Sequence, residues 1–269
     1  MFINTNVGAL NAHRNLTGNN GSLNKTMEKL SSGYRINRAA DDAAGLAISE
    51  KMRFQINGLN QAQRNAQDGI SLIQTAEGAL TETHAILQRL NTLANQSVNG
   101  TYDGTDRTKA QSEVTQLLSE IGNIASKTKF NGIDLLSAAG TVNFQVGSES
   151  GDTISVSLSD MSQAGLNLTG LSIATSTAAA TAIATIKNAI GTVSTQRATF
   201  GAVQNRLEHT INNLGVNAEN LSAAQSRIRD ADMAKEMTNF TKNQILVQAG
   251  TSMLAQANSV PQNVLKLLG

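Results

Sequence analysis

Few residues in this 269-residue chain stand at spacings that support catalysis or metal binding. The three histidines, His13, His84 and His209, lie far apart, and none belongs to an HExxH or similar metal-ligand spacing. The sequence contains no glycine-rich phosphate loop and no GxSxG nucleophile elbow. It has no cysteine, which excludes disulfides, thiolate metal ligands and cysteine nucleophiles. We therefore expect no catalytic residue, no cofactor and no bound metal.

Carboxylates cluster at two places, and both clusters suit helix capping and ion pairing. Asp41 and Asp42 follow Arg35 and Arg38 and precede the longest helical pattern, where acidic side chains interact favourably with the helix dipole. In residues 227–236 acids alternate with bases, which predicts a solvated or interfacial ion-pair network. The acids of this second cluster are Asp230, Asp232 and Glu236, and the bases are Arg227, Arg229 and Lys235.

The composition argues against several classes of protein. The 21 basic and 20 acidic residues give a net charge of +1, which favours neither nucleic acid nor an anionic membrane. Six Phe, two Tyr and no Trp argue against a compact enzyme with an aromatic core. No run of 18 apolar residues predicts a membrane-spanning helix, and Met1–Leu10 lacks the blocks of a cleaved secretory signal. We expect no membrane insertion, and export only by a route that needs no cleaved signal.

Apolar residues spaced alternately by three and four predict long helices. The first pattern covers residues 43–98, a helix of about 80 Å at 1.5 Å per residue. Such a rod cannot bury its apolar stripe alone, so it needs partner helices. We predict an elongated, antiparallel helical bundle from residues 43–128 and 180–229. Its apolar positions include Ile73, Leu80, Leu87, Leu90, Val114, Ile121, Leu207 and Leu214.

Between residues 129 and 175 the apolar period changes from 3.6 to two. Val142, Phe144 and Val146 alternate with polar residues, and a second alternating run follows a glycine-rich loop. This pattern predicts a β-hairpin at about 140–160, which should pack against the bundle because an isolated hairpin is marginal in water. The Ser/Thr/Ala stretch at about 172–185 is interpreted as a short linker or the start of a helix, with an exposed, glycosylated loop as a further alternative.

The two ends of the chain carry similar weak apolar stripes among many Asn, Gln, Thr and Gly residues. They hold too little apolar surface to form stable lone helices in water. We infer that the ends pair with each other as a coiled coil and with further copies, although ordinary frayed termini are the alternative. The stripes consist of Ile3, Val7, Leu10, Leu16, Leu23, Met27 and Leu30, and of Met233, Met237, Phe240, Val247 and Leu254.

Four segments closely resemble bacterial flagellin: residues 30–48, 67–80, 130–132 and 248–265. The resemblance implies a mainly α protein that polymerises into the flagellar filament and has no enzymatic role. It also implies the following division. Residues 1–43 and 230–269 form an inner-tube coiled-coil domain, residues 44–229 form an outer-tube bundle, and the linker at about 172–185 replaces the variable domains of larger relatives.

The resemblance further implies partners and a location. The protein would polymerise with itself, leave the cell unfolded through the flagellar export apparatus, and act in the extracellular flagellum. A C-terminal export chaperone and the hook-associated junction and cap proteins would be further partners. We expect the interface energy to come mainly from apolar residues at both ends, namely Ile3, Val7, Leu10, Leu254, Val264, Leu265 and Leu268.

Similarity also points to recognition by the animal Toll-like receptor for flagellin. The recognition pattern of the family aligns with residues 88–94 and with Glu113 on the next helix. Arg89 and Leu93 are four residues apart and share a helix face, so both could contact a receptor, although Leu93 could equally pack against a neighbouring subunit. Two other functions stay open: a hook–filament junction protein, which shares similar termini, and an extracellular enzyme.

Overall fold

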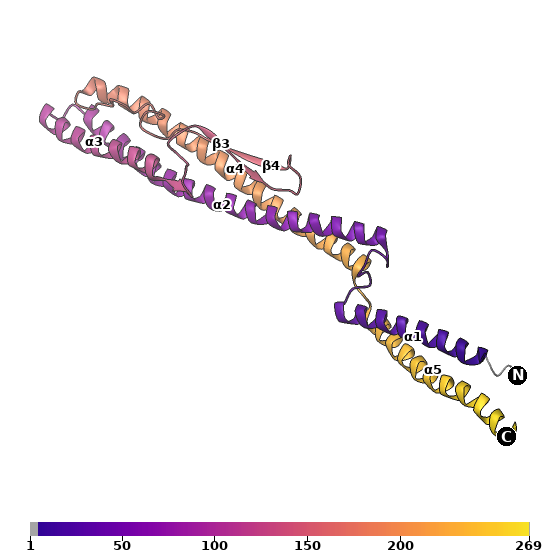
Figure 1. The fold of residues 1–269 in the computed structure, drawn as a ribbon. Coiled ribbons are helices and arrows are strands. Elements are labelled where there is room, and N and C mark those ends of the chain that lie inside the picture. Colours follow the sequence, from indigo (N-terminus) through magenta and orange to yellow (C-terminus); the bar gives the residue numbers. More distant parts are fainter. Residues whose placement is uncertain (1–4, 269) are drawn as a thin grey trace. The chain divides into compact units, whose positions relative to one another are not determined.

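The computed structural model describes residues 5–268, with side chains for residues 5–259, and most of these residues are helical (Figure 1). The prediction of a mainly α protein with a small hairpin region is confirmed. The helices are α1 (Val7–Ser32), α2 (Ala43–Val98), α3 (Gly104–Lys127), α4 (Ser176–Arg229) and α5 (Met233–Leu268). The strands are β1 (Lys129–Phe130), β2 (Ile133–Asp134), β3 (Gly140–Gln145) and β4 (Thr153–Leu158).

The chain folds into two compact units, and the boundaries between them fall within α2 and α4. The terminal unit comprises Met1–Ile56 and Glu219–Gly269, and the central unit comprises Asn57–Ala218. The predicted domain boundaries at residues 43/44 and 229/230 instead coincide with the start of α2 and the end of α4.

Side-chain caps fix where the long helices begin. The Asp42 carboxylate accepts a hydrogen bond from the backbone N–H of Gly45 (2.8 Å) at the start of α2. The Thr175 hydroxyl accepts one from the N–H of Ala178 (3.2 Å), so α4 begins at Ser176. The predicted linker at about 172–185 is therefore wrong over its last ten residues, and the alternative of a helix start is correct. Its alanines have high helix propensity, and Thr175 provides the cap.

In the central unit, α3 and α4 each run antiparallel to α2, which confirms the predicted antiparallel bundle. Arg89 of α2 pairs with Glu113 of α3, and Glu77 of α2 pairs with Arg197 of α4 (3.5 Å). At the C-terminal end of α2, the Ser176 hydroxyl of α4 donates a hydrogen bond to the Val98 carbonyl oxygen (3.2 Å). The predicted core positions Ile73, Leu80, Leu87, Leu90, Ile121 and Leu207 are fully buried.

The α4 contribution to this core includes residues that the sequence analysis did not recognise. The buried positions of α4 continue the alternation of three and four residues back to Ala179. Alanine gives a weak hydrophobic signal, yet it allows close approach of neighbouring helices. Loop residues complete the core, including Leu135, Leu136, Met161, Leu168 and Ile173.

The predicted hairpin is formed by β3 and β4, and it packs on the bundle. Phe144 lies opposite Ile154 in the antiparallel register, and both side chains are buried. On α2, Gly69 leaves space for the Phe144 ring, since a Cβ there would lie 3.1 Å from it. The Gln196 side chain of α4 donates to the Ser157 carbonyl oxygen (2.7 Å). The hairpin is thus held by α2 and α4 rather than by its own pairing alone.

In the terminal unit, α1 and α5 lie side by side and antiparallel (Figure 1). The Asn6 amide donates to the Ala257 carbonyl oxygen (2.7 Å), and the Asn243 amide donates to the Thr26 hydroxyl (3.2 Å). The prediction that the ends pair as a coiled coil is confirmed. The less exposed positions recur at spacings of three and four, and include Ala9, Ala12, Leu16, Asn19, Leu23, Thr26 and Leu30 of α1 and Glu236, Phe240, Asn243, Val247, Gly250, Leu254 and Ala257 of α5.

Substitution of two phenylalanines should report the difference in apolar burial between the two units. Phe200 of α4 is fully buried in the central unit, whereas Phe54 of α2 is 68% exposed in the terminal unit. We expect Phe200→Ala to lower the free energy of unfolding by about 3–5 kcal/mol, because it leaves a cavity in the core. The matched variant Phe54→Ala should change it by less than about 0.5 kcal/mol. Denaturant unfolding followed by circular dichroism measures both, and equal effects would contradict this assignment of the core.

Candidate assembly interface

The terminal unit has almost no hydrophobic core of its own. Within the part of the chain that the structure describes, Ile36 is its one buried apolar side chain, with 1% of its surface exposed. The other buried apolar residues belong to the central unit. Two paired helices bury only one face of each, so the α1–α5 pair keeps its outward faces exposed.

Large apolar side chains are exposed throughout the terminal unit. It holds most of the exposed large apolar residues of the described chain, and extensive apolar exposure marks interaction surfaces. In the terminal unit they are Val7, Leu10, Met27, Tyr34, Ile48, Phe54, Met233, Met237, Ile245, Leu246 and Met253, whereas the central unit adds Tyr102, Ile133 and Val216.

The structure separates the predicted interface residues into two groups. Val7 and Leu10 are 59% and 56% exposed, so they are available to a neighbouring molecule. Leu254 is half-buried on the seam between α5 and α1, where it contributes to pairing within the chain. Ile3 and the side chains of Val264, Leu265 and Leu268 lie outside the described residues.

The predicted stripes combine two faces of the terminal helices. Val7, Leu10 and Met237 were predicted in the same stripes as Leu16 and Val247, but the first three are exposed and the last two are half-buried. Phe54, Ile245 and Met253 are exposed interface candidates that were not predicted. Their signal is an offset from the three-and-four spacing, which becomes visible only once the buried seam is known.

Two connectors, residues 33–42 and 230–232, join the terminal helices to α2 and α4. They pair as a short antiparallel bridge between Tyr34 and Asp230. The N–H of Arg35 donates to the Arg229 carbonyl oxygen (2.7 Å), and the N–H of Ala231 donates to the Gly33 carbonyl oxygen (2.9 Å). The bridge therefore provides hydrogen-bond partners for backbone N–H and C=O groups that would otherwise lack them at the helix ends.

Asp41 orders the first connector from within. Its carboxylate accepts hydrogen bonds from the backbone N–H groups of Arg38 (3.0 Å) and Asn37 (3.2 Å). These bonds lower the pKa of Asp41 below its ordinary value because they stabilise the charged form. The capping predicted for this acidic pair is confirmed for Asp42, which caps α2, whereas Asp41 binds the connector instead.

Arg229 fastens the connectors to α2. Its guanidinium lies 2.6 Å from the Glu50 carboxylate and 4.6 Å from the centre of the Tyr34 ring, and its side chain is only 14% exposed. The stacked, planar ion pair suits arginine better than lysine. Both connectors and the start of α2 thus meet at one side chain.

This arrangement corrects the prediction of an ion-pair network within residues 227–236. Arg229 pairs with Glu50, and Glu236 pairs with Lys29 of α1 (3.9 Å). Asp232 instead caps α5 by accepting from the N–H groups of residues 234 and 235. The charges act between helices because neighbours in sequence point to different sides of a helix.

Arg89 and Glu113 form an exposed ion pair in the central unit. Arg89 Nε lies 2.7 Å from Glu113 Oε1, and the two side chains are 51% and 42% exposed. The hydrogen bond to Glu113, and then its charge, raise the pKa of Arg89. Leu93, which was predicted to share an exposed face with Arg89, is only 3% exposed and packs in the core. The correction follows from the 40° offset of residues four apart, which turns Leu93 inward.

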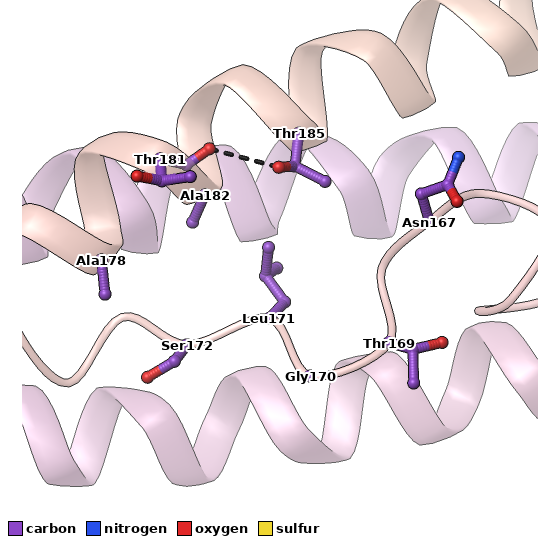
Figure 2. Close-up of a pocket in the computed structure, with 9 residues that line it drawn as sticks. All are labelled: Asn167, Thr169, Gly170, Leu171, Ser172, Ala178, Thr181, Ala182 and Thr185. Carbon is purple, nitrogen blue, oxygen red and sulfur yellow. Dashed lines mark hydrogen bonds between the residues drawn. The ribbon is translucent and has the colours of Figure 1, made fainter.

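The pocket of about 330 Å³ between residues 167–172 and the first turns of α4 offers no reactive group (Figure 2). No charged side chain lines it, and the hydroxyls of Thr181 and Thr185 donate to carbonyl oxygens one turn earlier in α4.

Among the residues that the structure describes, no three His, Asp or Glu side chains gather as a metal ion would require. No helix in this part of the chain is both long and apolar enough to cross a membrane.

Removing the Arg229 side chain should loosen the connectors. We expect Arg229→Ala to accelerate tryptic cleavage after Arg35 and Arg38 about tenfold, because local opening of the bridge becomes easier. Arg229→Lys should fall between this variant and the unsubstituted chain, since it keeps the charge but not the stacking. Arg206→Ala, which removes the same charge from an exposed position of α4, is the control. Timed mass spectrometry of the fragments measures the rates, and unchanged cleavage in Arg229→Ala would contradict the role of this side chain.

Comparison with known proteins identifies the chain. Residues 3–141 match the bacterial flagellin N-terminal helical region, and residues 183–268 match the bacterial flagellin C-terminal helical region. The chain is 53% identical to flagellin from Bacillus subtilis and 55% identical to flagellin from Halalkalibacterium halodurans, in each case over 100% of both proteins. The crystal structure of Bacillus cereus flagellin matches it with a TM-score of 0.52 and 37% identity, over 60% of this chain and 94% of that one. The chain belongs to the bacterial flagellin family, as a short member that lacks the variable domain.

Proposed function

We propose that this protein is the structural subunit of a bacterial flagellar filament, in which many identical copies polymerise outside the cell. The observation that carries the proposal is the surface of the terminal unit, where large apolar side chains are exposed and, among the described residues, Ile36 is the one buried apolar side chain. Copies that pack against these faces would supply the burial that the single chain lacks. Full-length identity to flagellins favours this role over that of a hook–filament junction protein.

The assembly would be an open helical tube, because a head-to-tail contact that does not close into a ring continues indefinitely. Residues 1–43 and 230–269 would form its inner wall and residues 44–229 its outer wall. A stiff tube turned at its base converts rotation into thrust for swimming. This mechanism is mechanical, so it assigns no catalytic residue.

The same marginal terminal unit suits the remaining partners of this proposal. A chain whose ends gain their stability from neighbours is easily kept unfolded for passage through the flagellar export apparatus, directed by N-terminal residues that are not cleaved. The exposed apolar side chains of α5, such as Ile245 and Met253, offer a cytoplasmic export chaperone a binding surface. Hook-associated junction and cap proteins would occupy the two ends of the filament.

A second proposal concerns the animal Toll-like receptor for flagellin. Arg89 and Glu113 present a charged, half-exposed pair on adjacent helices of the central unit, and arginine is frequent among the residues that dominate binding energy. Leu93 would support this surface from the core rather than contact the receptor.

Charge at an outward apolar position should block polymerisation. We expect Leu10→Asp to lower the rate of seeded filament growth at least about tenfold, because burying an unpaired carboxylate in the contact is costly. Leu10→Met keeps the surface apolar and should polymerise normally. Sedimentation and negative-stain electron microscopy measure filament mass and length, and circular dichroism of the monomers checks the fold. Long filaments from Leu10→Asp at the normal rate would refute the proposed interface.

Loss of the arginine should weaken receptor signalling by the monomer. We expect Arg89→Ala to raise the concentration for half-maximal signalling about tenfold, which corresponds to about 1.4 kcal/mol of binding energy. Arg64→Ala, at an exposed position of the same helix, serves as the control. Reporter cells that carry the receptor measure the response. Equal potency of Arg89→Ala and the unsubstituted monomer would exclude Arg89 from the contact.

A further inference from the structure

Four methionines of the terminal unit are exposed. Met27 of α1 is 44% exposed, and Met233, Met237 and Met253 of α5 are 47%, 51% and 65% exposed. By contrast, Met161 of the central unit is 1% exposed and belongs to the core. One chain therefore holds thioethers in two very different environments.

Exposure decides how readily a thioether is oxidised. A peroxide transfers one oxygen atom to the methionine sulfur, which loses two electrons and forms an S=O bond, while the peroxide is reduced to water or an alcohol. The peroxide O–O bond breaks, and no bond to carbon does. The product is a polar, chiral sulfoxide in place of a flexible apolar side chain.

The positions of these methionines make the change consequential for assembly. Met237 and Met253 lie on outward surfaces of α5, together with Ile245 and Leu246. In the proposed filament these surfaces pack against other copies and lose their water. A sulfoxide oxygen buried there without a hydrogen-bond donor destabilises the contact, as does any unpaired buried polar group.

We propose that Met27, Met233, Met237 and Met253 form an oxidation-sensitive switch on assembly. Peroxides oxidise these four side chains in the monomer, and their sulfoxides prevent polymerisation. Methionine sulfoxide reductases restore it with a dithiol as the reductant, which is oxidised to a disulfide while the sulfoxide oxygen leaves as water. Packing in the filament shields the same side chains from further oxidation. The inference rests on the proposed function, because it requires these faces to be contacts between copies.

The first experiment measures the rate of oxidation at each site. Monomer is treated with hydrogen peroxide, and timed peptide mapping by mass spectrometry follows the gain of one oxygen atom. We expect Met237 and Met253 to react at least about tenfold faster than Met161, which serves as the internal control. In assembled filaments the rates at these two sites should fall at least about tenfold. Similar rates for Met161 and Met253, or no protection in filaments, would overturn the proposal.

The second experiment tests the consequence for assembly. Peroxide-treated monomer should lose at least about nine-tenths of its seeded growth, and treatment with methionine sulfoxide reductases should restore it. The fourfold variant with Met27→Leu, Met233→Leu, Met237→Leu and Met253→Leu keeps the apolar surface but has no thioether at these sites. It should polymerise after peroxide treatment, whereas Met161→Leu should remain sensitive.

The outcomes separate this inference from the proposed function. Untreated monomer that does not extend seeds would refute the filament subunit itself. Normal growth of monomer that carries sulfoxide at all four sites would refute the switch and leave the filament subunit standing. If peroxide treatment reduced the growth of the fourfold variant as much as that of the unsubstituted chain, the switch would also be refuted, since oxidation of other side chains would then cause the loss.

Discussion

The uneven burial of apolar surface is the constraint on which the rest of this structure depends. Two helices in contact can hide one face each, and the α1–α5 pair does only that. Three helices, a hairpin and several loop residues around one core can hide much more, as in the central unit. One chain therefore combines a self-sufficient core with ends that remain incomplete until other copies cover them. Polymerisation provides the burial of apolar surface that the terminal unit lacks.

The seam between α1 and α5 is itself only partly apolar. Asn19 and Thr26 alternate with leucines on α1, and Asn243 lies between Phe240 and Val247 on α5. The Asn243–Thr26 hydrogen bond lies within the seam. Polar groups in a seam lower its stability but restrict its register. Such a pair opens easily and yet returns to one alignment when neighbours arrive. The exposed methionines outside the seam add chemical sensitivity to the same surfaces.

Only a few contacts in the connectors order the helix ends. A single antiparallel bridge, the Asp41 carboxylate and the Arg229 guanidinium satisfy the backbone and position the start of α2. Arg229 is only 14% exposed, so solvent screens its interaction with Glu50 less than it screens a fully exposed ion pair. The order of this region thus depends on a few specific polar contacts rather than on a core.

The sequence alone determined the class and location of most elements. A long run of apolar residues spaced by three and four specified α2 and the antiparallel bundle, and the alternation around Phe144 specified the hairpin. These signals could be read from the sequence because they are local and repeat many times. The flagellin-like segments identified the family. The tertiary structure alone decided which face each residue occupies. Leu93 is buried beside exposed Arg89, Met237 points away from the seam, Arg229 selects Glu50 over its neighbours in sequence, and alanines rather than large residues continue α4 into the core. These outcomes depend on rotations of less than half a helical turn and on partners distant in the chain, which local periodicity does not encode.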